Sequence, residues 1–559
     1  MIRLCRNGVL AAATSVGLAL LLSIAPAAAA KPTSHSAAPA SRPQAVPWAG
    51  APNSDGLSLS PASSTLVPYG AAGYRYATVD YDDLQGFEDP AFDDVAAGFT
   101  FGAAAFANGT CGGPFQTSWT GVNDLLVRKE VVVPSGTSDV AVSIAIDNDV
   151  QVFWNGVDVS AGMVASEGCA VQDEYTFVVP NALLVGGENL LAVRARNRHL
   201  SSAQHLDIQV NATVPNEPPT ALFVHGWNGS FRADEVGFFP LLDPLRSAYP
   251  GRVVEFEHFQ DLGRRQGDGS CLQPRPIPMP DEPTQGMPIT LGGTELTQCD
   301  SQGDIGLNAV ALHHDVRDIY VATGGKVVVI ANSGGAPIAR GLLSYSDARG
   351  DGLVRQAVDS MVLLEPAADG AWAANAAGAA DNVVQFLFGQ ETNFQLARPA
   401  SVDLAPVSDW YQWANPRALP DVPYFNVFGD ISLVTIDCPW FSDECREVER
   451  EKWGDTIMNT GTDDPFDVPA GGGARFLHGA LGPQNWQWAL TVDLQRGPFS
   501  LSPNRIDVFA NPVSHWNFNA QIGNIQTTDC MTGAAVAVAD ALLNVIEGRM
   551  NQEPYECEP

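Results

Sequence analysis

The stretch from Lys326 to Arg340 reads KVVVIANSGGAPIAR, a run of β-branched residues that stops at Asn-Ser-Gly-Gly. This pattern predicts a buried strand that turns sharply into a helix, with Ser333 at the turn. Strand and helix pass close to each other at such a turn, so the residues two before and two after the serine must be small. Gly335 meets this demand, and Ala331 adds only a methyl group. Ser333 is therefore either a nucleophile or a serine that only forms a turn.

Predicted strands and helices alternate on both sides of this stretch, which indicates an α/β domain with a parallel sheet over residues 219–559. The strands are expected at 220–226, 252–259, 326–333, 360–366, 422–430 and 505–512, and the helices at 234–250, 305–324, 335–347 and 534–550. Long irregular insertions remain at 259–304, 368–400 and 431–500. Insertions of this length in a compact domain are typical of lids or caps.

The composition limits the possible partners. The 559 residues include 63 acidic and 30 basic side chains, a formal net charge of -33. A surface of this charge repels phosphate backbones and anionic headgroups, so the sequence disfavours nucleic-acid binding. The acidic residues are spread along the chain and do not form a single tail, as expected for a soluble exported protein.

The N-terminus has the pattern of a secretory signal peptide over residues 1–30. Two arginines precede an apolar run that ends in small residues, with cleavage expected near Ala30. Residues 31–56 are rich in Ala, Pro and Ser and are expected to be disordered. Eight cysteines remain after cleavage, and an even number in an exported chain predicts disulfides, with sequence neighbours as the simplest pairing. They are Cys111, Cys169, Cys271, Cys299, Cys438, Cys445, Cys530 and Cys557.

Residues 57–213 show short alternating strands and no long helical period, so they predict an all-β sandwich. A linker, 214–218, separates the sandwich from the α/β domain. The segments AFDDVAAGFTFG, NDVQVFWNGVDV and GENLLAVRARN resemble the galactose-binding-like jelly roll that accompanies many secreted enzymes. That resemblance implies either a sugar-binding module or a spacer. Four residues could lie at a loop end and bind a ligand, but turn and core roles are favoured for them: Asp147, Asp149, Trp154 and Asn155.

The motif Ala-Asn-Ser-Gly-Gly resembles the nucleophile elbow of the α/β-hydrolase family, in the Ala-x-Ser-x-Gly variant of secreted bacterial lipases. The resemblance implies that Ser333 is the nucleophile and that an acid and a histidine follow it in that order. Only His478 and His515 lie downstream of Ser333. His515 follows the expected last strand, where the family places its base, so it is favoured over His478 in the 431–500 insertion.

The same family order implies an acid after a late strand. Asp430 ends the expected strand 422–430 and is the leading candidate, because a carboxylate there would orient the histidine. Glu365, at the end of the preceding strand, is the alternative, and Asp437 is a third candidate. A turn-forming role remains the competing interpretation of Asp430.

An oxyanion hole requires two backbone N–H donors aimed at the developing negative charge. The resemblance assigns one donor to Gly334, directly after the nucleophile. The segment HGWNG, from His225 to Gly229, resembles the oxyanion loop of the same lipases and implies that Trp227 supplies the other donor.

Two further patterns have a structural as well as a functional interpretation. His313 and His314 suggest a metal pair, but adjacent helical positions point about 100° apart, which favours a solvated helix surface. Aromatic residues in and near the insertions could line an acyl or polymer cleft or form small cores: Trp372, Phe386, Phe388, Phe394, Trp410, Trp413, Trp440, Phe441, Trp486 and Trp488.

The sequence thus predicts a secreted serine hydrolase that cleaves carboxylic esters with Ser333, His515 and Asp430, without an organic cofactor or a catalytic metal. The expected partner is an ester substrate, with a possible glycan or surface contact through the sandwich, and neither nucleic acid nor a transmembrane anchor. Three alternatives stay open: a polyester depolymerase that uses the sandwich to bind its substrate, a peptidase or amidase, and a non-catalytic binding protein.

Overall fold

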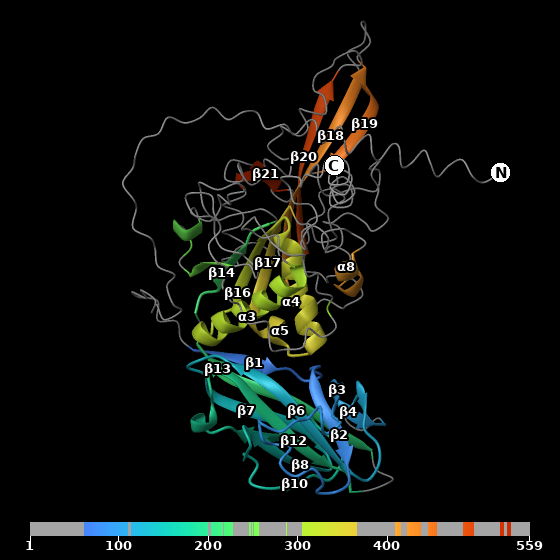
Figure 1. Cartoon of the computed structure of the whole chain (residues 1–559), viewed down its shortest axis with the longest axis vertical. Coiled ribbons are helices and arrows are strands. Elements are labelled where there is room, and N and C mark those ends of the chain that lie inside the picture. The colour runs from blue at the N-terminus through green and yellow to red at the C-terminus, as the bar shows by residue number, and fades with distance from the viewer. Residues whose placement is uncertain are drawn as a thin grey trace, which may run out of the picture.

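The structure is a computed structural model of the whole chain. It describes residues 61–109, 113–198, 203–215, 217–226, 245–247, 249, 251–256, 287, 304–365, 408–414, 422–437, 445–454, 485–496, 526–529 and 534–537. A β-sandwich lies at one end, a mostly parallel sheet with helices lies in the middle, and long strands project at the other end (Figure 1). No helix in these ranges is long and apolar enough to cross a membrane.

The sandwich consists of two sheets of short and medium strands. One sheet has the order β11-β7-β13-β4-β5, with β1 on β13, and the other has the order β10-β8-β12-β6-β2-β3, with β9 on β8. The strands are β1 Ala62–Val67, β2 Tyr74–Val79, β3 Thr100–Gly102, β4 Phe106–Asn108, β5 Thr117–Ser118, β6 Asp124–Val133, β7 Ser138–Asp147, β8 Asp149–Trp154, β9 Val157–Asp158, β10 Val164–Ala165, β11 Tyr175–Val178, β12 Gly187–Arg196 and β13 Gln204–Val214. A short 3₁₀ helix, η1, spans Asn181–Leu183.

The core of the sandwich lies between its two sheets. On one sheet Ile144 of β7 pairs with Ile208 of β13, and on the other Val127 of β6 pairs with Val193 of β12. All four side chains belong to one buried cluster. The alternating residues of these strands thus place their apolar side chains inward, as the period-two pattern predicts.

A buried ion cluster lies at one end of β6. The Asp124 carboxylate accepts hydrogen bonds from Arg194 Nη1 at 2.9 Å, Arg196 Nε at 2.7 Å and the Asp82 N–H at 3.0 Å. Burial by itself would raise the pKa of Asp124, but these donors and the charge of Arg196 lower it overall. The carboxylate therefore stabilises the fold only while it is ionised.

Replacing Asp124 with asparagine is expected to destabilise the protein by about 3–5 kcal/mol at pH 7, because two arginines lose their buried partner. Because the native pKa is lowered, this carboxylate contributes stability above its unfolded pKa and loses it as the pH falls. Urea unfolding of both proteins at pH 7 and pH 3 checks this. The difference between them should be smaller at pH 3, and an equal difference at both pH values would contradict the assignment.

The middle of the molecule contains a third sheet with the order β15-β14-β16-β17-β18-β19, with β20 also on β18. All of its strand pairs are parallel except β18 with β19. The strands are β14 Thr220–Val224, β15 Val253–Glu255, β16 Val327–Asn332, β17 Val358–Leu364, β18 Tyr424–Asp437, β19 Arg446–Gly454 and β20 Asn485–Arg496. The helices are α3 Ile305–Thr323, α4 Gly335–Arg349, α5 Leu353–Ala357 and α8 Asp409–Ala414. The sequence therefore predicted the class of this region correctly.

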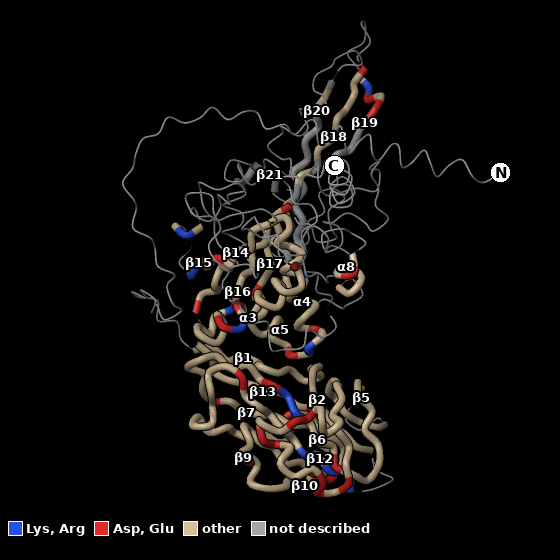
Figure 2. The backbone as a smooth tube through the Cα atoms, in the orientation of Figure 1, with Lys and Arg blue, Asp and Glu red and all other residues tan. Residues whose placement is uncertain are grey.

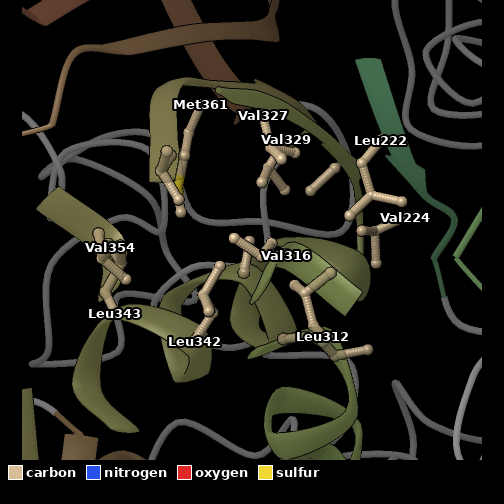
Figure 3. Close-up of a cluster of buried hydrophobic side chains, with 14 of the residues drawn as sticks. Leu222, Val224, Leu312, Val316, Val327, Val329, Leu342, Leu343, Val354 and Met361 are labelled. Atoms are coloured by element: carbon tan, nitrogen blue, oxygen red, sulfur yellow. The ribbon is translucent and has the colours of Figure 1, made fainter. Parts of the chain in front are cut away.

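Helices α3, α4 and α5 cover one face of this sheet. Figure 3 shows strand side chains facing helix side chains within a cluster of buried apolar residues. The labelled residues are Leu222, Val224, Val327, Val329 and Met361 from the strands and Leu312, Val316, Leu342, Leu343 and Val354 from the helices. The core anchors strand β16 and helix α4, which meet at the Ser333 turn.

Two segments have a structure different from the one that the sequence predicted. Residues 431–500 were predicted to be an irregular insertion, but they contain the second half of β18 and the strands β19 and β20. Residues 534–537 were predicted to begin a helix, but they form strand β22, Ala534–Ala537, which pairs with β21, Gln526–Asp529. The strand expected at 505–512 lies outside the described residues. In both corrected segments, pairing with a distant strand overrides the local pattern.

The sandwich packs directly against the α/β region. Val132 of β6 belongs to the same buried cluster as Leu312 and Val316 of α3. The Ser135 N–H donates to the Val321 carbonyl at 2.7 Å. Lys129 Nζ donates to the Gly350 carbonyl at 3.2 Å, and burial lowers the pKa of this lysine to about 8. This interface resembles a continuous core more than a flexible connection between modules.

Acidic residues occur on both the sandwich and the α/β region, as Figure 2 shows, in agreement with the spread of charge along the sequence. Cys169 and Cys445 each form a disulfide bond. The pairing of cysteines that are neighbours in the sequence stays a prediction.

Candidate active site

Ser333 occupies the turn between β16 and α4. Its backbone φ is +49°, in the left-handed region that non-glycine residues rarely adopt. The Ser333 N–H donates to the Leu364 carbonyl at 2.9 Å, and its own carbonyl accepts from the Ala336 N–H at 3.1 Å. A serine held in this region between a strand and a helix has the backbone geometry that the nucleophile interpretation of the motif requires, although Asn155 adopts the same φ in a structural turn.

The turn leaves no room for a side chain at Gly335. A Cβ on this residue would lie 2.5 Å from the Val224 carbonyl oxygen and 2.9 Å from that of His225. Ala331, the other small residue of the motif, is fully buried on β16 and pairs with Val224 of β14. The structure therefore accounts for both small residues: glycine is required at one position, and a methyl group is accommodated at the other.

The loop after β14 lies directly against the turn. A Cβ on Gly226 would lie 2.7 Å from the Ser333 Cβ and 3.1 Å from the Gly334 nitrogen. His225 is buried, and its Nδ1 lies 3.1 Å from the Gly226 carbonyl oxygen. The contact between Gly226 and the turn was not predicted from the sequence. The one feature of the sequence that pointed to Gly226 was its position in the segment HGWNG, which resembles an oxyanion loop.

Gly334 is the N-cap residue of α4, between Ser333 and the first helical residue. The first N–H groups of a helix have no partner within the helix, and the helix dipole is positive at this end. A negative oxygen formed beside Ser333 would therefore meet a favourable field. The structure places Gly334 and Gly226 together at this point, while Trp227 lies outside the described residues.

The end of β17 adjoins the turn on the other side. Glu365 directly follows β17, has a φ of +46° and is only 1% exposed. Its N–H donates to the Val427 carbonyl at 2.7 Å, and its Oε1 accepts from the Gly429 N–H at 2.9 Å. A carboxylate thus lies at the same edge of the sheet as Ser333.

The register of β18 locates the other two acidic candidates. Val427 pairs with Leu364, the last residue of β17. Asp430 follows three residues later, about 10 Å along the strand, and Asp437 follows ten residues later, about 33 Å along. The strand does not end at Gly429–Asp430, as the sequence predicted, but continues to Asp437. Asp430 thus stays near the edge that carries Ser333, whereas Asp437 lies far along the projecting strands and contacts Arg446 at 3.1 Å.

The two candidate bases, His478 and His515, lie outside the described residues. Of the proposed site residues, the structure therefore places Ser333 and Gly334 fully, Glu365 with its side chain, and Asp430 by its backbone position in β18. The roles of His515 and Trp227 stay predictions.

The four sandwich candidates have structural roles. Trp154 is fully buried in the core, and its Nε1 donates to Asn189 Oδ1 at 3.2 Å. Asn155 forms the hairpin turn with a φ of +49° and accepts from the Leu190 N–H at 2.7 Å. Asp147 and Asp149 are buried, and Asp149 lies 3.0 Å from Arg198 Nε. Trp154 and Asn155 therefore hold the sandwich together, as the favoured interpretation predicted, whereas the two aspartates are buried and not solvated.

One member of the histidine pair on α3 contacts a carboxylate. His313 is buried, not solvated as predicted, and its Nε2 lies 2.7 Å from Asp351 Oδ2. Burial alone would raise the pKa of Asp351, but His313, the Ser346 hydroxyl and the Leu353 N–H together lower it well below its usual value. No cluster of three or more His, Cys, Asp or Glu residues that could bind a metal occurs within the described ranges.

Two of the aromatic candidates have defined surroundings. Trp410 is 1% exposed and belongs to the core of the α/β region, and Trp413 packs against the same core. Both therefore take part in the core that holds helix α8, the second of the two interpretations. The side chains of Trp486 and Trp488 on β20 and the remaining aromatic candidates lie outside the described residues.

Comparisons with known proteins give only distant similarities. No protein-family model matches the chain, and no curated protein matches it. The phospholipase PlaB from Legionella pneumophila is 14% identical with a TM-score of 0.24, over 42% of this chain and 50% of that one. The lipase BlEst2 from Bacillus licheniformis is 20% identical with a TM-score of 0.23, over 38% of this chain and 66% of that one. A β-glucuronidase of glycoside hydrolase family 2 is 15% identical with a TM-score of 0.20, over 27% of this chain.

The chain covers 18% of that β-glucuronidase, and TM-scores this low establish no common fold. The proposed function is therefore based on the geometry around Ser333 and on the sequence motifs.

Proposed function

We propose that this protein is a secreted serine hydrolase with an α/β-hydrolase domain, and that it cleaves carboxylic esters through an acyl-enzyme. The main observation is the strained turn at Ser333, with a φ of +49°, against which Gly226 packs. A strand-to-helix turn of this kind exposes the serine hydroxyl at the edge of a parallel sheet, next to the N-terminus of the following helix. The strained conformation at a strand-to-helix turn supports a reactive role for this hydroxyl.

In the proposed reaction the Ser333 hydroxyl attacks the ester carbonyl carbon while His515 accepts its proton. His515 then returns the proton to the leaving alcohol, which departs and leaves an acyl-serine. Water, deprotonated by the same histidine, releases the carboxylic acid and restores Ser333. Asp430 keeps the imidazole in the correct tautomer and stabilises its charged form.

The tetrahedral intermediates carry a negative oxygen. The Gly334 N–H at the start of α4 and the Trp227 N–H from the adjoining loop are proposed to donate to it. The close packing of Gly226 on Ser333 supports this assignment, because the next residue of that loop begins within reach of the turn. Preorganised backbone donors of this kind each contribute about 10²–10³-fold to the rate.

Labelling with a fluorophosphonate tests the proposal directly. Such a probe phosphonylates an activated serine, so mass spectrometry of the digested protein should find the adduct on Ser333. Turnover of p-nitrophenyl esters should exceed that of the matching anilides. An unlabelled Ser333 together with absent ester turnover would favour a non-catalytic binding protein, and faster anilide turnover would favour a peptidase or amidase.

Export is part of the same proposal and rests on the N-terminal signal pattern. The sandwich, in its resemblance to galactose-binding-like modules, is proposed to contact a glycan or an insoluble substrate. Polyester hydrolysis is the alternative substrate class. Clearing of a polyester film, compared with hydrolysis of an emulsified triglyceride, separates the two.

A further inference from the structure

Glu365 connects the nucleophile turn to the strand that carries Asp430. We propose that Glu365 is a positioning residue, whose carboxylate fixes the backbone leading into Asp430 relative to Ser333. This inference rests on the proposed function, in which Asp430 is the acid of the triad. It gives Glu365 a role different from that of an alternative acid.

Three hydrogen bonds join the two sides. The Ser333 N–H donates to the carbonyl of Leu364, the last residue of β17, at 2.9 Å. The next residue, Glu365, donates its N–H to the Val427 carbonyl at 2.7 Å. The Glu365 Oε1 then accepts from the Gly429 N–H at 2.9 Å. Consecutive residues of one segment therefore bind the nucleophile turn on one side and the approach to Asp430 on the other.

The side chain of Glu365 continues the β-ladder where the backbone of β17 can no longer do so. The positive φ of Glu365 turns the chain away from β18 directly after the Glu365–Val427 hydrogen bond. The next N–H of β18 that faces β17 belongs to Gly429, and the carboxylate oxygen takes the place of the missing carbonyl. Because Glu365 is only 1% exposed, water cannot readily substitute for this acceptor.

The hydrogen bond from the Gly429 N–H to the Glu365 carboxylate also affects the position of Asp430. Glycine restricts the backbone least of all residues, so the direction of the chain at Gly429 depends on its hydrogen bonds. Asp430 follows immediately and inherits that direction. Without the carboxylate, β18 would still pair with β20 at Gly429 and Asp430. On the β17 side, however, the Gly429 N–H would lose its hydrogen bond.

Two substitutions separate the effect of the Glu365 charge from the effect of its side-chain length. Glu365→Gln loses the charge but keeps an amide oxygen at the same distance along the side chain. Glu365→Asp keeps the charge but is one methylene too short to reach the Gly429 N–H. We expect Glu365→Gln to keep kcat within about tenfold of the wild type. Glu365→Asp should lower kcat by about 10²-fold with little change in KM, the size of effect that a displacement of about 1 Å produces.

The pH profile distinguishes positioning from a merely structural role. If Asp430 moves away from His515 in Glu365→Asp, the imidazolium loses stabilisation and the acid limb of kcat/KM shifts to lower pH. A general loss of stability would lower the urea midpoint without moving this limb. Asp430→Asn serves as the reference, with an expected loss of about 10⁴-fold in kcat.

The outcomes separate this inference from the proposed function. If kcat of Glu365→Gln falls as far as kcat of Asp430→Asn, Glu365 is the triad acid and the positioning role is wrong. The same conclusion follows if Asp430→Asn keeps the wild-type kcat. If Glu365→Asp keeps the wild-type kcat and pH profile, Glu365 has no positioning role, although fluorophosphonate still labels Ser333. If the wild type is not labelled at Ser333, the proposed function itself fails.

Discussion

Ser333→Ala is expected to reduce ester turnover by at least about 10⁴-fold, because the hydroxyl that forms the acyl-enzyme is gone. Binding of a non-hydrolysable ester analogue should change little, since the Gly334 N–H and the packing of Gly226 do not depend on the hydroxyl. Initial rates with p-nitrophenyl esters, together with calorimetric binding of the analogue, measure both effects. Undiminished turnover in this variant would show that another group carries the reaction.

Ser333→Gly provides a matched control that also tests the strain. Glycine adopts a φ of +49° without the steric penalty that other residues experience, which is about 1 kcal/mol or more. This variant should therefore be as inactive as Ser333→Ala but more stable than it by about 1 kcal/mol. Urea unfolding of the two variants gives the comparison. Equal stability would mean that the turn is not strained and would weaken the argument for a nucleophile.

The second large effect concerns the sandwich. Val132→Asp is expected to destabilise the α/β region together with the sandwich, by about 3–5 kcal/mol, because it places a charge in a core that both share. Deletion of residues 31–213 should likewise leave an α/β region that is aggregated or inactive on soluble esters, since the apolar partners of Val132 become exposed. Thermal unfolding and soluble-ester turnover measure both changes.

Val178 is the matched control for this substitution. It lies on β11 of the same sandwich and is 67% exposed, so Val178→Asp should change stability by less than about 0.5 kcal/mol. If the truncated chain folds cooperatively and hydrolyses soluble esters at the full rate, the sandwich is an independent module and the shared core has no energetic importance.

Local sequence patterns determined a large part of the α/β region. The run of β-branched residues before Ser333 predicted β16, and the apolar period after it predicted α4, because both depend on side chains a few residues apart. The requirement for small residues at Ala331 and Gly335 was also readable, since a turn between a strand and a helix imposes it wherever it occurs. The proposed class of chemistry is based on these residues and on the order of the acidic and histidine candidates.

Pairing between distant strands could not be read in this way. The segment from Asn485 to Arg496 appeared to be part of an insertion, yet it pairs with β18 along its whole length. The segment Ala534–Ala537 has residues that favour a helix, yet it pairs with β21. Such strands gain their stability from partners far along the chain, and a local pattern does not contain those partners.

The sequence by itself determined which residue is the candidate nucleophile, because the turn that exposes Ser333 depends on its immediate neighbours. Only the tertiary structure decided what surrounds that serine: Gly226 packed on the turn, Glu365 bound to the Gly429 N–H, and Val132 of the sandwich within the core that supports α3. These contacts join residues far apart in the chain, and strand register and sheet order, which set the distances between them, arise only when the whole chain folds.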